Sequence, residues 1–199
     1  MKTLLIAIFC AVLTSCTKSE SIPDQDQLPP VTEVGSNKAG FLLNGKVIIP
    51  KNGTQAIGTG ANYGLFKNQG INFWPNKNDY WQLEIANKKD NKSASIFLWI
   101  KNMSTGNGNY VVGQCNGSLY SYGPNNNQII AFSDVDNVNK VYYSSVNSGN
   151  IKITRSDLGS GISIYSGIFN ATLYNKDNTA EKIQITEGRF DINSLTLNN

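Results

Sequence analysis

The order of apolar and polar residues predicts strands and turns along most of the chain. After residue 37, short β-branched and aromatic runs alternate with clusters of Gly, Asn, Ser and Asp. Such runs are typical of strands, whereas a helix would place apolar residues three and four positions apart. Outside three hairpins, we expect strands at residues 95–101, 118–122, 128–134, 140–146 and 150–155, with turns such as 147–150 between them. The sequence therefore predicts an all-β fold, either an antiparallel β-sandwich or a flattened, meander-rich up-and-down barrel.

The first hairpin is predicted around Asn44 and Gly45, within the sequence FLLNGKVIIP. Asn-Gly between two apolar runs is the strongest two-residue turn signal, because both positions of such a turn need positive φ. This turn pairs Leu43 with Lys46 and Phe41 with Ile48. We interpret Asn44 and Gly45 as structural residues.

A second hairpin is predicted in INFWPNKNDYWQLEI, with a loop at residues 75–79. Pairing Trp74 with Tyr80 separates the side chains into two faces, since successive residues of a strand point to opposite sides. The apolar face holds Ile71, Phe73, Trp81 and Leu83. The other face holds Asn72, Trp74, Tyr80 and Gln82.

The last hairpin is predicted to be bent. A register that pairs Ala171 with Ile185 also pairs Ile164 with Ile192, and a shift by one residue breaks every such match. In this register both strands change their apolar face at one level, beside Gly167 and Gly188. Paired glycines at a change of face suggest a sharp bend in the ribbon, so we interpret both glycines, and the neighbouring Arg189, as architectural.

The start of the chain has the pattern of an export signal. Lys2 is followed by an apolar run at residues 4–13, which is shorter than the roughly 20 residues of a spanning helix. Leu13, Thr14 and Ser15 then precede Cys16, as in a bacterial lipobox. We expect residues 1–15 to be a lipoprotein signal peptide and Cys16 to carry the lipid. The alternative is an ordinary signal peptide with a coincidental cysteine.

Residues 16–37 are polar and contain proline, so we expect a lipidated flexible tether that leads into a single all-β domain at residues 38–199. With Cys10 in the signal and Cys16 acylated, Cys115 has no partner for a disulfide. Two or more acyl chains hold a protein stably on a membrane. The expected location is therefore the cell envelope, at the outer membrane. The prediction does not specify the periplasmic or the surface side.

Composition excludes several function classes. The 199 residues carry a net charge of +3 and no histidine. The balanced charge gives no indication of a nucleic-acid partner. Without histidine, the chain has no Ser-His-Asp or Cys-His catalytic set and no histidine ligand for zinc. We expect no catalytic residue, no metal site and no cofactor. The segment 134–139 departs from the EF-hand calcium pattern, and a turn explains it better.

Three stretches carry a resemblance to a known group of proteins. These are the lipobox cysteine, LPPVTEVGSNKAGFLLNGKVIIP at residues 28–50, and SGIFNATLYN with IQITEGRFDI within residues 166–192. Together they resemble an uncharacterised family of Bacteroidota lipoproteins. Where relatives have Phe-Gly, this chain has Gly40-Phe41. The resemblance implies an exported single-domain lipoprotein and no particular chemistry.

The best binding candidate is the polar and aromatic face of the second hairpin, because aromatic rings beside amides suit carbohydrate or peptide recognition. Its residues are Asn72, Trp74, Tyr80 and Gln82, with Trp99 as an additional member. We expect a monomeric, non-enzymatic envelope domain that binds a glycan, a peptide or a partner protein. The alternatives are a structural or assembly lipoprotein without a small-molecule site and, least expected, a carboxylate-based hydrolase.

Overall fold

The computed structural model describes residues 26–53, 65–70, 80–89, 94–101, 105–118, 125–135, 138–157 and 164–197. These ranges contain ten strands and no helix. The strands are β1 (Lys38–Leu43), β2 (Lys46–Ile48), β3 (Leu65–Gly70), β4 (Tyr80–Ala86), β5 (Ala94–Lys101), β6 (Gly108–Val112), β7 (Gln128–Val135), β8 (Val138–Ser156), β9 (Ile164–Asn175) and β10 (Lys182–Asn193). The predicted all-β fold is confirmed.

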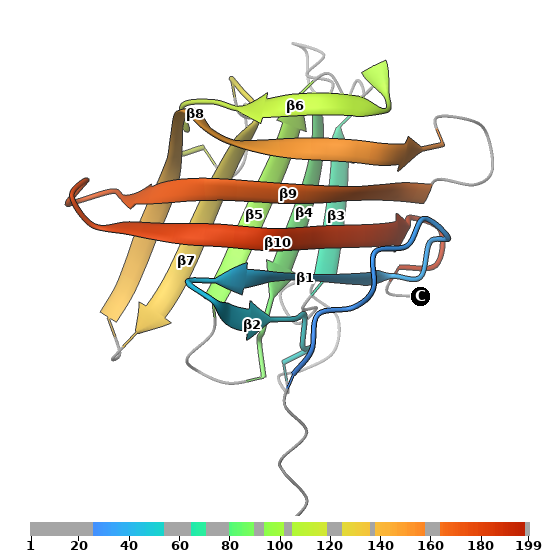
Figure 1. The fold of residues 1–199 in the computed structure, drawn as a ribbon, viewed down its shortest axis with the longest axis horizontal. Coiled ribbons are helices and arrows are strands. Elements are labelled where there is room, and N and C mark those ends of the chain that lie inside the picture. The colour runs from blue at the N-terminus through green and yellow to red at the C-terminus, as the bar shows by residue number, and fades with distance from the viewer. Residues whose placement is uncertain are drawn as a thin grey trace, which may run out of the picture.

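The ten strands form one antiparallel sheet that curls into two layers. Its order is β2-β1-β10-β9-β8-β7-β5-β4-β3, and β6 pairs with β8 beside this path. In Figure 1 the front layer contains β6, β9, β10, β1 and β2, and the strands β7, β5, β4 and β3 cross behind it at a steep angle. β8 belongs to both layers. The arrangement is a curled half-barrel whose two layers enclose the core, in keeping with the predicted sandwich or barrel.

The main core lies between these layers. Trp81 of the back layer is fully buried, and its ring centroid lies 5.7 Å from that of Tyr165 and 5.3 Å from that of Phe190 in the front layer. Leu83 beside Trp81 is likewise fully buried. Aromatic and aliphatic side chains from both layers therefore hold the curled sheet closed by removing apolar surface from water.

The first hairpin has the predicted register. Phe41 pairs with Ile48 and Leu43 with Lys46. Asn44 and Gly45 have φ angles of 48° and 83°, which a two-residue hairpin turn of this kind requires. The short strand β2 is an end of the sheet, and Asn44 also accepts a hydrogen bond from the amide of Gln184 on β10 through its Oδ1 atom at 2.8 Å.

The second hairpin differs from the prediction. β4 pairs with residues 65–70, and Tyr80 stands opposite Gly70, so the predicted pair of Trp74 with Tyr80 is wrong. The predicted and observed registers differ by four residues. Because an even shift leaves every side chain on its face, the alternation of apolar residues does not distinguish between them. Residues 71–79, including the predicted loop, lie outside the described ranges.

The predicted strands 140–146 and 150–155 are parts of one strand, β8, and not two strands joined by a turn. Ser144 pairs with Leu173 and Gly149 with Ala171, so residues 145–148 stand opposite a single residue of β9. This bulge bends β8 from its partner β7 toward its partner β6. A Cβ at Gly149 would lie 2.2 Å from the carbonyl oxygen of Asn170, so only glycine fits this close approach.

Two further strands were predicted correctly, at residues 95–101 (β5) and 128–134 (β7). Strand β6 was not expected. Of the predicted strand 118–122, only Ser118 is described, and it lies outside any strand.

The C-terminal hairpin is bent by a bulge in one strand. Ala171 pairs with Ile185, as predicted, but the register shifts between Ile185 and Gly188, and Ile192 pairs with Tyr165 instead of Ile164. The bulge contains Glu187, whose φ is 50°. Only β10 therefore changes which of its residues face the core: they are odd-numbered on one side of the bulge and even-numbered on the other.

The predicted change of face in β9 is wrong. The main core contains the odd-numbered residues Tyr165, Phe169, Ala171 and Leu173, which span nearly the whole strand. Ile164 is buried on the opposite face, where a Cβ at Gly35 would lie 3.1 Å from its Cγ1 atom. Because the segment before β1 covers Ile164, an apolar residue stands at an even position of β9, and this suggested a change of face that β9 does not have.

Gly167 and Gly188 make room for two phenylalanine rings. Gly188 stands opposite Phe169 and Gly167 opposite Phe190. A Cβ at Gly188 would lie 2.4 Å from the Phe169 ring, and a Cβ at Gly167 would lie 2.8 Å from the Phe190 ring. The two rings are stacked, with centroids 6.3 Å apart. Each glycine thus lets the ring of the neighbouring strand lie flat over the backbone.

Candidate functional site

The described members of the predicted binding face are buried. Gln82 is 3% exposed and Trp99 is 2% exposed, and the two stand opposite each other on β4 and β5. Trp99 belongs to a small aromatic cluster with Phe97 and Phe132, on the side of β5 away from the main core. Asn72, Trp74 and the side chain of Tyr80 lie outside the described residues. Gln82 and Trp99 therefore provide no exposed surface for a ligand.

A different aromatic pair lies at the surface, where the curled sheet turns from one layer into the other. Tyr143 of β8 stands opposite Tyr174 of β9, and both side chains are partly exposed. Opposite residues of an antiparallel pair have Cβ atoms about 5 Å apart, so the rings are neighbours on the outer face. They border a hollow of about 490 Å³, which we call the tyrosine hollow. Its other lining residues that reach the surface are the exposed Gln114, Lys176 and Thr179 and the partly exposed Ser145.

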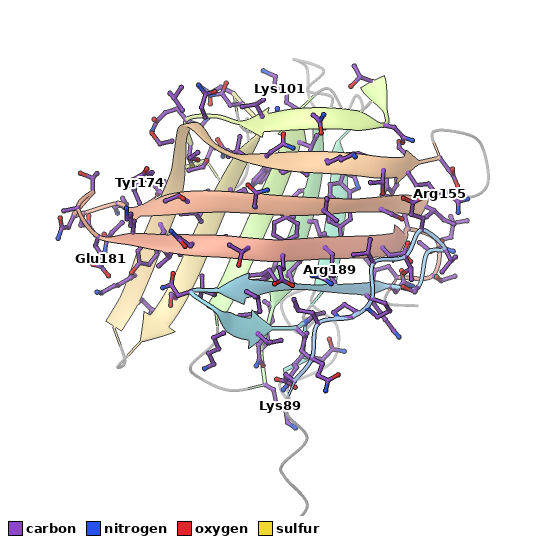
Figure 2. All side chains as sticks on the ribbon, viewed as in Figure 1. Lys89, Lys101, Arg155, Tyr174, Glu181 and Arg189 are labelled. Atoms are coloured by element: carbon purple, nitrogen blue, oxygen red, sulfur yellow. The ribbon has the colours of Figure 1, made fainter. Side chains whose placement is uncertain are left out.

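Local features of the backbone create the tyrosine hollow. One side is the β8 bulge, where Ser145 donates from Oγ to Oε1 of Gln114 at 3.2 Å. The other side is the turn between β9 and β10, which brings Lys176 and Thr179 to the hollow. Figure 2 shows Tyr174 and Glu181 at this same end of β9 and β10. The hollow has the size of ordinary ligand pockets, which range from about 300 to 1,000 Å³.

Glu181 fixes the turn beside the hollow. Its Oε1 accepts hydrogen bonds from Lys140 Nζ and from the Tyr142 hydroxyl, both at 2.7 Å. Its Oε2 accepts from Asn175 Nδ2 at 3.0 Å, and Asn175 Oδ1 in turn accepts from the backbone amide of Asp177 at 2.8 Å. The carboxylate therefore ties the turn to β8 and orients Asn175, which borders the hollow.

The same contacts perturb two ionisable groups. Hydrogen bonds from Lys140 and then Tyr142 lower the pKa of Glu181 below its ordinary value. Burial and, after it, the hydrogen bond to Glu181 raise the pKa of Tyr142 to about 12. Glu181 is therefore a carboxylate and Tyr142 a neutral phenol at physiological pH. The charge of Glu181 is compensated by Lys140 and is not offered to the hollow.

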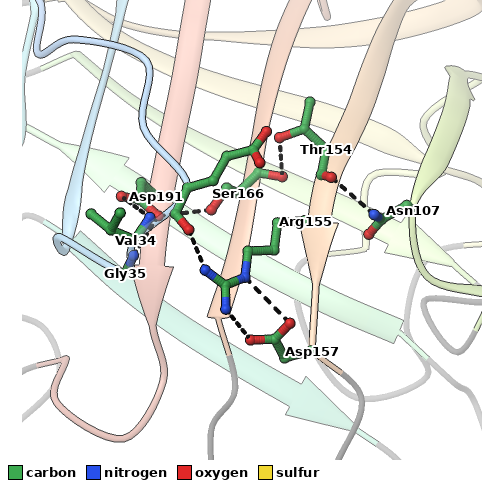
Figure 3. A network of polar contacts seen from close by, with 9 residues as sticks. Val34, Gly35, Asn107, Thr154, Arg155, Asp157, Ser166 and Asp191 are labelled. Atoms are coloured by element: carbon green, nitrogen blue, oxygen red, sulfur yellow. Dashed lines mark hydrogen bonds and ion pairs between the residues drawn. The ribbon is translucent and has the colours of Figure 1, made fainter.

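A second polar cluster surrounds Asp191 on the outer face of β10. Asp191 is 3% exposed and accepts six hydrogen bonds. Its Oδ1 accepts from the amide of Gly35 at 2.8 Å and from Ser166 Oγ at 2.7 Å. Its Oδ2 accepts from Thr32 Oγ1, from the amide of Val34, and from the amide and hydroxyl of Ser36. Figure 3 shows part of this network.

The Asp191 cluster holds residues 26–37, the N-terminal strap, against the sheet. Burial opposes ionisation of Asp191, but hydrogen bonds led by those of Thr32 and Ser166 outweigh it and lower the pKa. Two arginines hold carbonyl groups of the strap, since Arg155 donates to the carbonyl of Glu33 and Arg189 to that of Pro29. Residues 26–37 were expected to be part of a free tether. They lie against the domain instead.

The polar clusters around Glu181 and Asp191 have structural roles. Asp191 is saturated with hydrogen-bond donors, and Glu181 accepts from three side chains. Cys115 is buried, and burial raises the pKa of its thiol, which keeps it protonated. Among the described residues, no group of three or more His, Cys, Asp or Glu side chains could hold a metal ion. The described part of the chain also has no helix of the length and apolarity needed to cross a membrane.

The tyrosine hollow was missed by the sequence analysis for a definable reason. Tyr143 and Tyr174 each occupy the polar-facing position of an alternating strand, which is a weak signal on its own. Their pairing depends on the register before the bulge, and the predicted turn at residues 147–150 hid that β8 and β9 stay paired on both sides of it. An exposed tyrosine on each of two paired strands would have been the useful signal.

Comparison with known proteins adds no family to this description. No protein family, no curated protein and no solved structure matches the chain. The resemblance to Bacteroidota lipoproteins thus stays a prediction, and the functional interpretation depends on the geometry of the tyrosine hollow and of the strap.

Proposed function

We propose that this chain is a lipid-anchored envelope protein whose β domain binds a ligand and catalyses no reaction. The observation that carries the proposal is the exposed pair of Tyr143 and Tyr174 in a hollow with amide and hydroxyl groups around it. Aromatic faces beside a few polar groups are typical of ligand sites. A glycan, a peptide or a partner protein of the envelope could use such a surface.

The lining of the tyrosine hollow supports binding over catalysis. The described residues of the lining supply tyrosine, amide, hydroxyl and ammonium side chains and no carboxylate. A glycosidase needs two carboxyl groups on either side of the scissile bond. Of the two carboxylates on the turn beside the hollow, Glu181 has both oxygens engaged by neighbouring side chains, and Asp177 points into solvent with its side chain 82% exposed. The hydrolase alternative therefore receives no support from this site.

The strap sets how far the domain would stand from the membrane in this proposal. If Cys16 carries the lipid, the chain between Cys16 and Asp26 spans at most about 35 Å when fully extended. A free tether over residues 16–37 would span about 70 Å. The docked strap, which ends in an ion pair of Asp26 with Lys51 at 2.6 Å, would therefore keep the domain close to the membrane surface.

The proposal is tested with cells that produce the full-length wild type, Cys16→Ala, or the double variant Tyr143→Ala/Tyr174→Ala. Envelope fractions are prepared, and the protein and any material bound to it are quantified. We expect Cys16→Ala to leave the membrane fraction, because it lacks the acyl chains. We expect the double variant to stay on the membrane and to lose its bound material.

Two outcomes would overturn parts of the proposal. A Cys16→Ala protein that remains on the membrane would contradict the lipid anchor. A double variant that folds and still retains all bound material would contradict the tyrosine hollow as the binding surface, and would favour the alternative of a structural or assembly lipoprotein.

A further inference from the structure

We propose that the tyrosine hollow, together with Lys182 beside it, binds a saccharide that carries a carboxylate group. This inference rests on the proposed function and adds the chemical class of the ligand. It follows from the row of side chains across three strands, from the distribution of charge around the hollow, and from the pairing of both tyrosine-bearing strands with neighbours on each side.

Three residues form a row on the outer face of the sheet. Tyr143 of β8 stands opposite Tyr174 of β9, and Tyr174 stands opposite Lys182 of β10. Opposite residues on neighbouring strands point to the same face, so two aromatic rings and an ammonium group lie side by side. The row presents apolar ring faces and then a positive charge, which matches a sugar ring that bears an acidic substituent.

The charge at the hollow is positive. Lys176 lines the hollow and its side chain is 51% exposed, and its contact with Asp177 spans 4.0 Å between two exposed groups. Such a surface pair holds its partners weakly. Lys182 is exposed and takes part in none of the ion pairs that the described residues form. By contrast, Lys140 is held by Glu181 at 2.7 Å.

The backbone around the hollow favours a saccharide over an extended peptide. At the row, β9 pairs with β8 on one side and with β10 on the other, so its backbone groups are engaged in the sheet. In the β8 bulge, the amide of Ser145 already donates to Ser148 Oγ at 3.0 Å. A peptide that binds by strand addition needs a free edge, and neither β8 at Tyr143 nor β9 at Tyr174 has one. Gln114, Ser145 and Thr179 offer side-chain groups for sugar hydroxyls instead.

The test uses the full-length lipidated protein in detergent and isothermal titration calorimetry. The probes are trisaccharides of galacturonate, glucuronate and N-acetylmuramate, each compared with its neutral counterpart of galactose, glucose or N-acetylglucosamine. A triglutamate peptide provides an acidic ligand without a sugar ring. We expect at least one acidic trisaccharide to bind at least about tenfold more tightly than its neutral counterpart, because a charge-assisted hydrogen bond contributes that much.

Variants separate the contributions of charge and ring. Lys182→Ala and Lys176→Ala should each weaken the acidic trisaccharide and leave the neutral one unchanged. Lys152→Ala removes an exposed lysine of β8 on the same outer face and should change neither affinity. Tyr174→Ala should weaken both kinds of sugar, and Tyr174→Phe, which keeps the ring, should retain most of the affinity.

The outcomes distinguish this inference from the proposed function. Equal binding of acidic and neutral sugars, lost in Tyr174→Ala, would overturn the acidic class and leave the binding site in place. Binding of triglutamate without any acidic trisaccharide would overturn the saccharide in favour of an acidic peptide. Failure of all six trisaccharides and the peptide would overturn the inference. The envelope experiment with the double variant would then decide separately whether the tyrosine hollow is a binding surface.

Discussion

Asp191→Asn is the substitution that tests the strap most sharply. It keeps the shape of the side chain and removes its charge and one of its two acceptor oxygens. In the wild type, Oδ2 accepts four hydrogen bonds and Oδ1 accepts two. We expect the asparagine oxygen to take the position of Oδ2, where it faces the larger group of hydrogen-bond donors. Its amide group then faces the N–H of Gly35, which loses its acceptor, while the Ser166 hydroxyl can rotate to accept a bond.

The expected cost follows from these bonds. A hydrogen bond to a charged group contributes about 1.5–3 kcal/mol, and a buried donor without an acceptor costs about 1–3 kcal/mol. Because Ser166 can adapt, we expect docking of the strap to weaken by about 3 kcal/mol, which corresponds to about a hundredfold in its equilibrium. Asp157→Asn is the matched control, because Asp157 pairs with Arg155 at the surface and should change docking by less than about 1 kcal/mol.

The assay is amide hydrogen exchange of the full-length protein. In Asp191→Asn, the amides of Val34, Gly35 and Ser36 should exchange about a hundredfold faster, since opening of the strap becomes easier by that factor. Amides in the centre of β9 should change much less. Unchanged exchange at Gly35 and Ser36, or an equal effect in Asp157→Asn, would refute the assignment of Asp191 as the residue that holds the strap.

Three further predictions concern packing, pH and the turn. Gly188→Ala should lower the free energy of unfolding by about 1–3 kcal/mol in urea, because its Cβ would overlap the Phe169 ring, and a loss below about 0.5 kcal/mol would contradict this. Acid should release the strap: the pKa of Asp191 is lower in the folded state than its unfolded value of about 3.9, so docking is fully stable above pH 4 and weakens as pH falls below it. Proteolysis of the strap between pH 6 and pH 5 would contradict that sign. Glu181→Gln removes the charged acceptor of Tyr142, so amides of the turn at residues 176–181 should exchange faster, and unchanged rates would show that the turn is stable without it.

The sequence predicted the fold class and the local features that alternation and turn chemistry control. Asn-Gly gave the first hairpin its register, because few residues other than Asn and Gly adopt positive φ. The outer part of the last hairpin was also correct, with Ala171 opposite Ile185. Features that insert residues into a ladder were missed. The bulge at Glu187 displaces the register by one position, and period-2 alternation cannot separate such a bulge from a change of face in both strands.

Burial on the second face of a strand was the other source of error. Ile164 is buried by the strap, and Trp99 is buried in an aromatic cluster outside the main core. Each of these side chains lies on the face away from the main core, and the alternation of residues within a strand does not show what covers it there. The two described members of the predicted binding face are buried for the same reason. The predicted face contained Gln82 and Trp99, which are buried, whereas Tyr143 and Tyr174 meet only because a bulge keeps β8 and β9 paired.

Ligand binding at the tyrosine hollow can be observed directly by amide hydrogen exchange of the full-length protein with and without saturating saccharide from its own envelope. We predict slower exchange at residues 143–145 and 174–179, which border the hollow, with little change at the strap or in β6. Protection that appears elsewhere and leaves these two segments unchanged would contradict the claim.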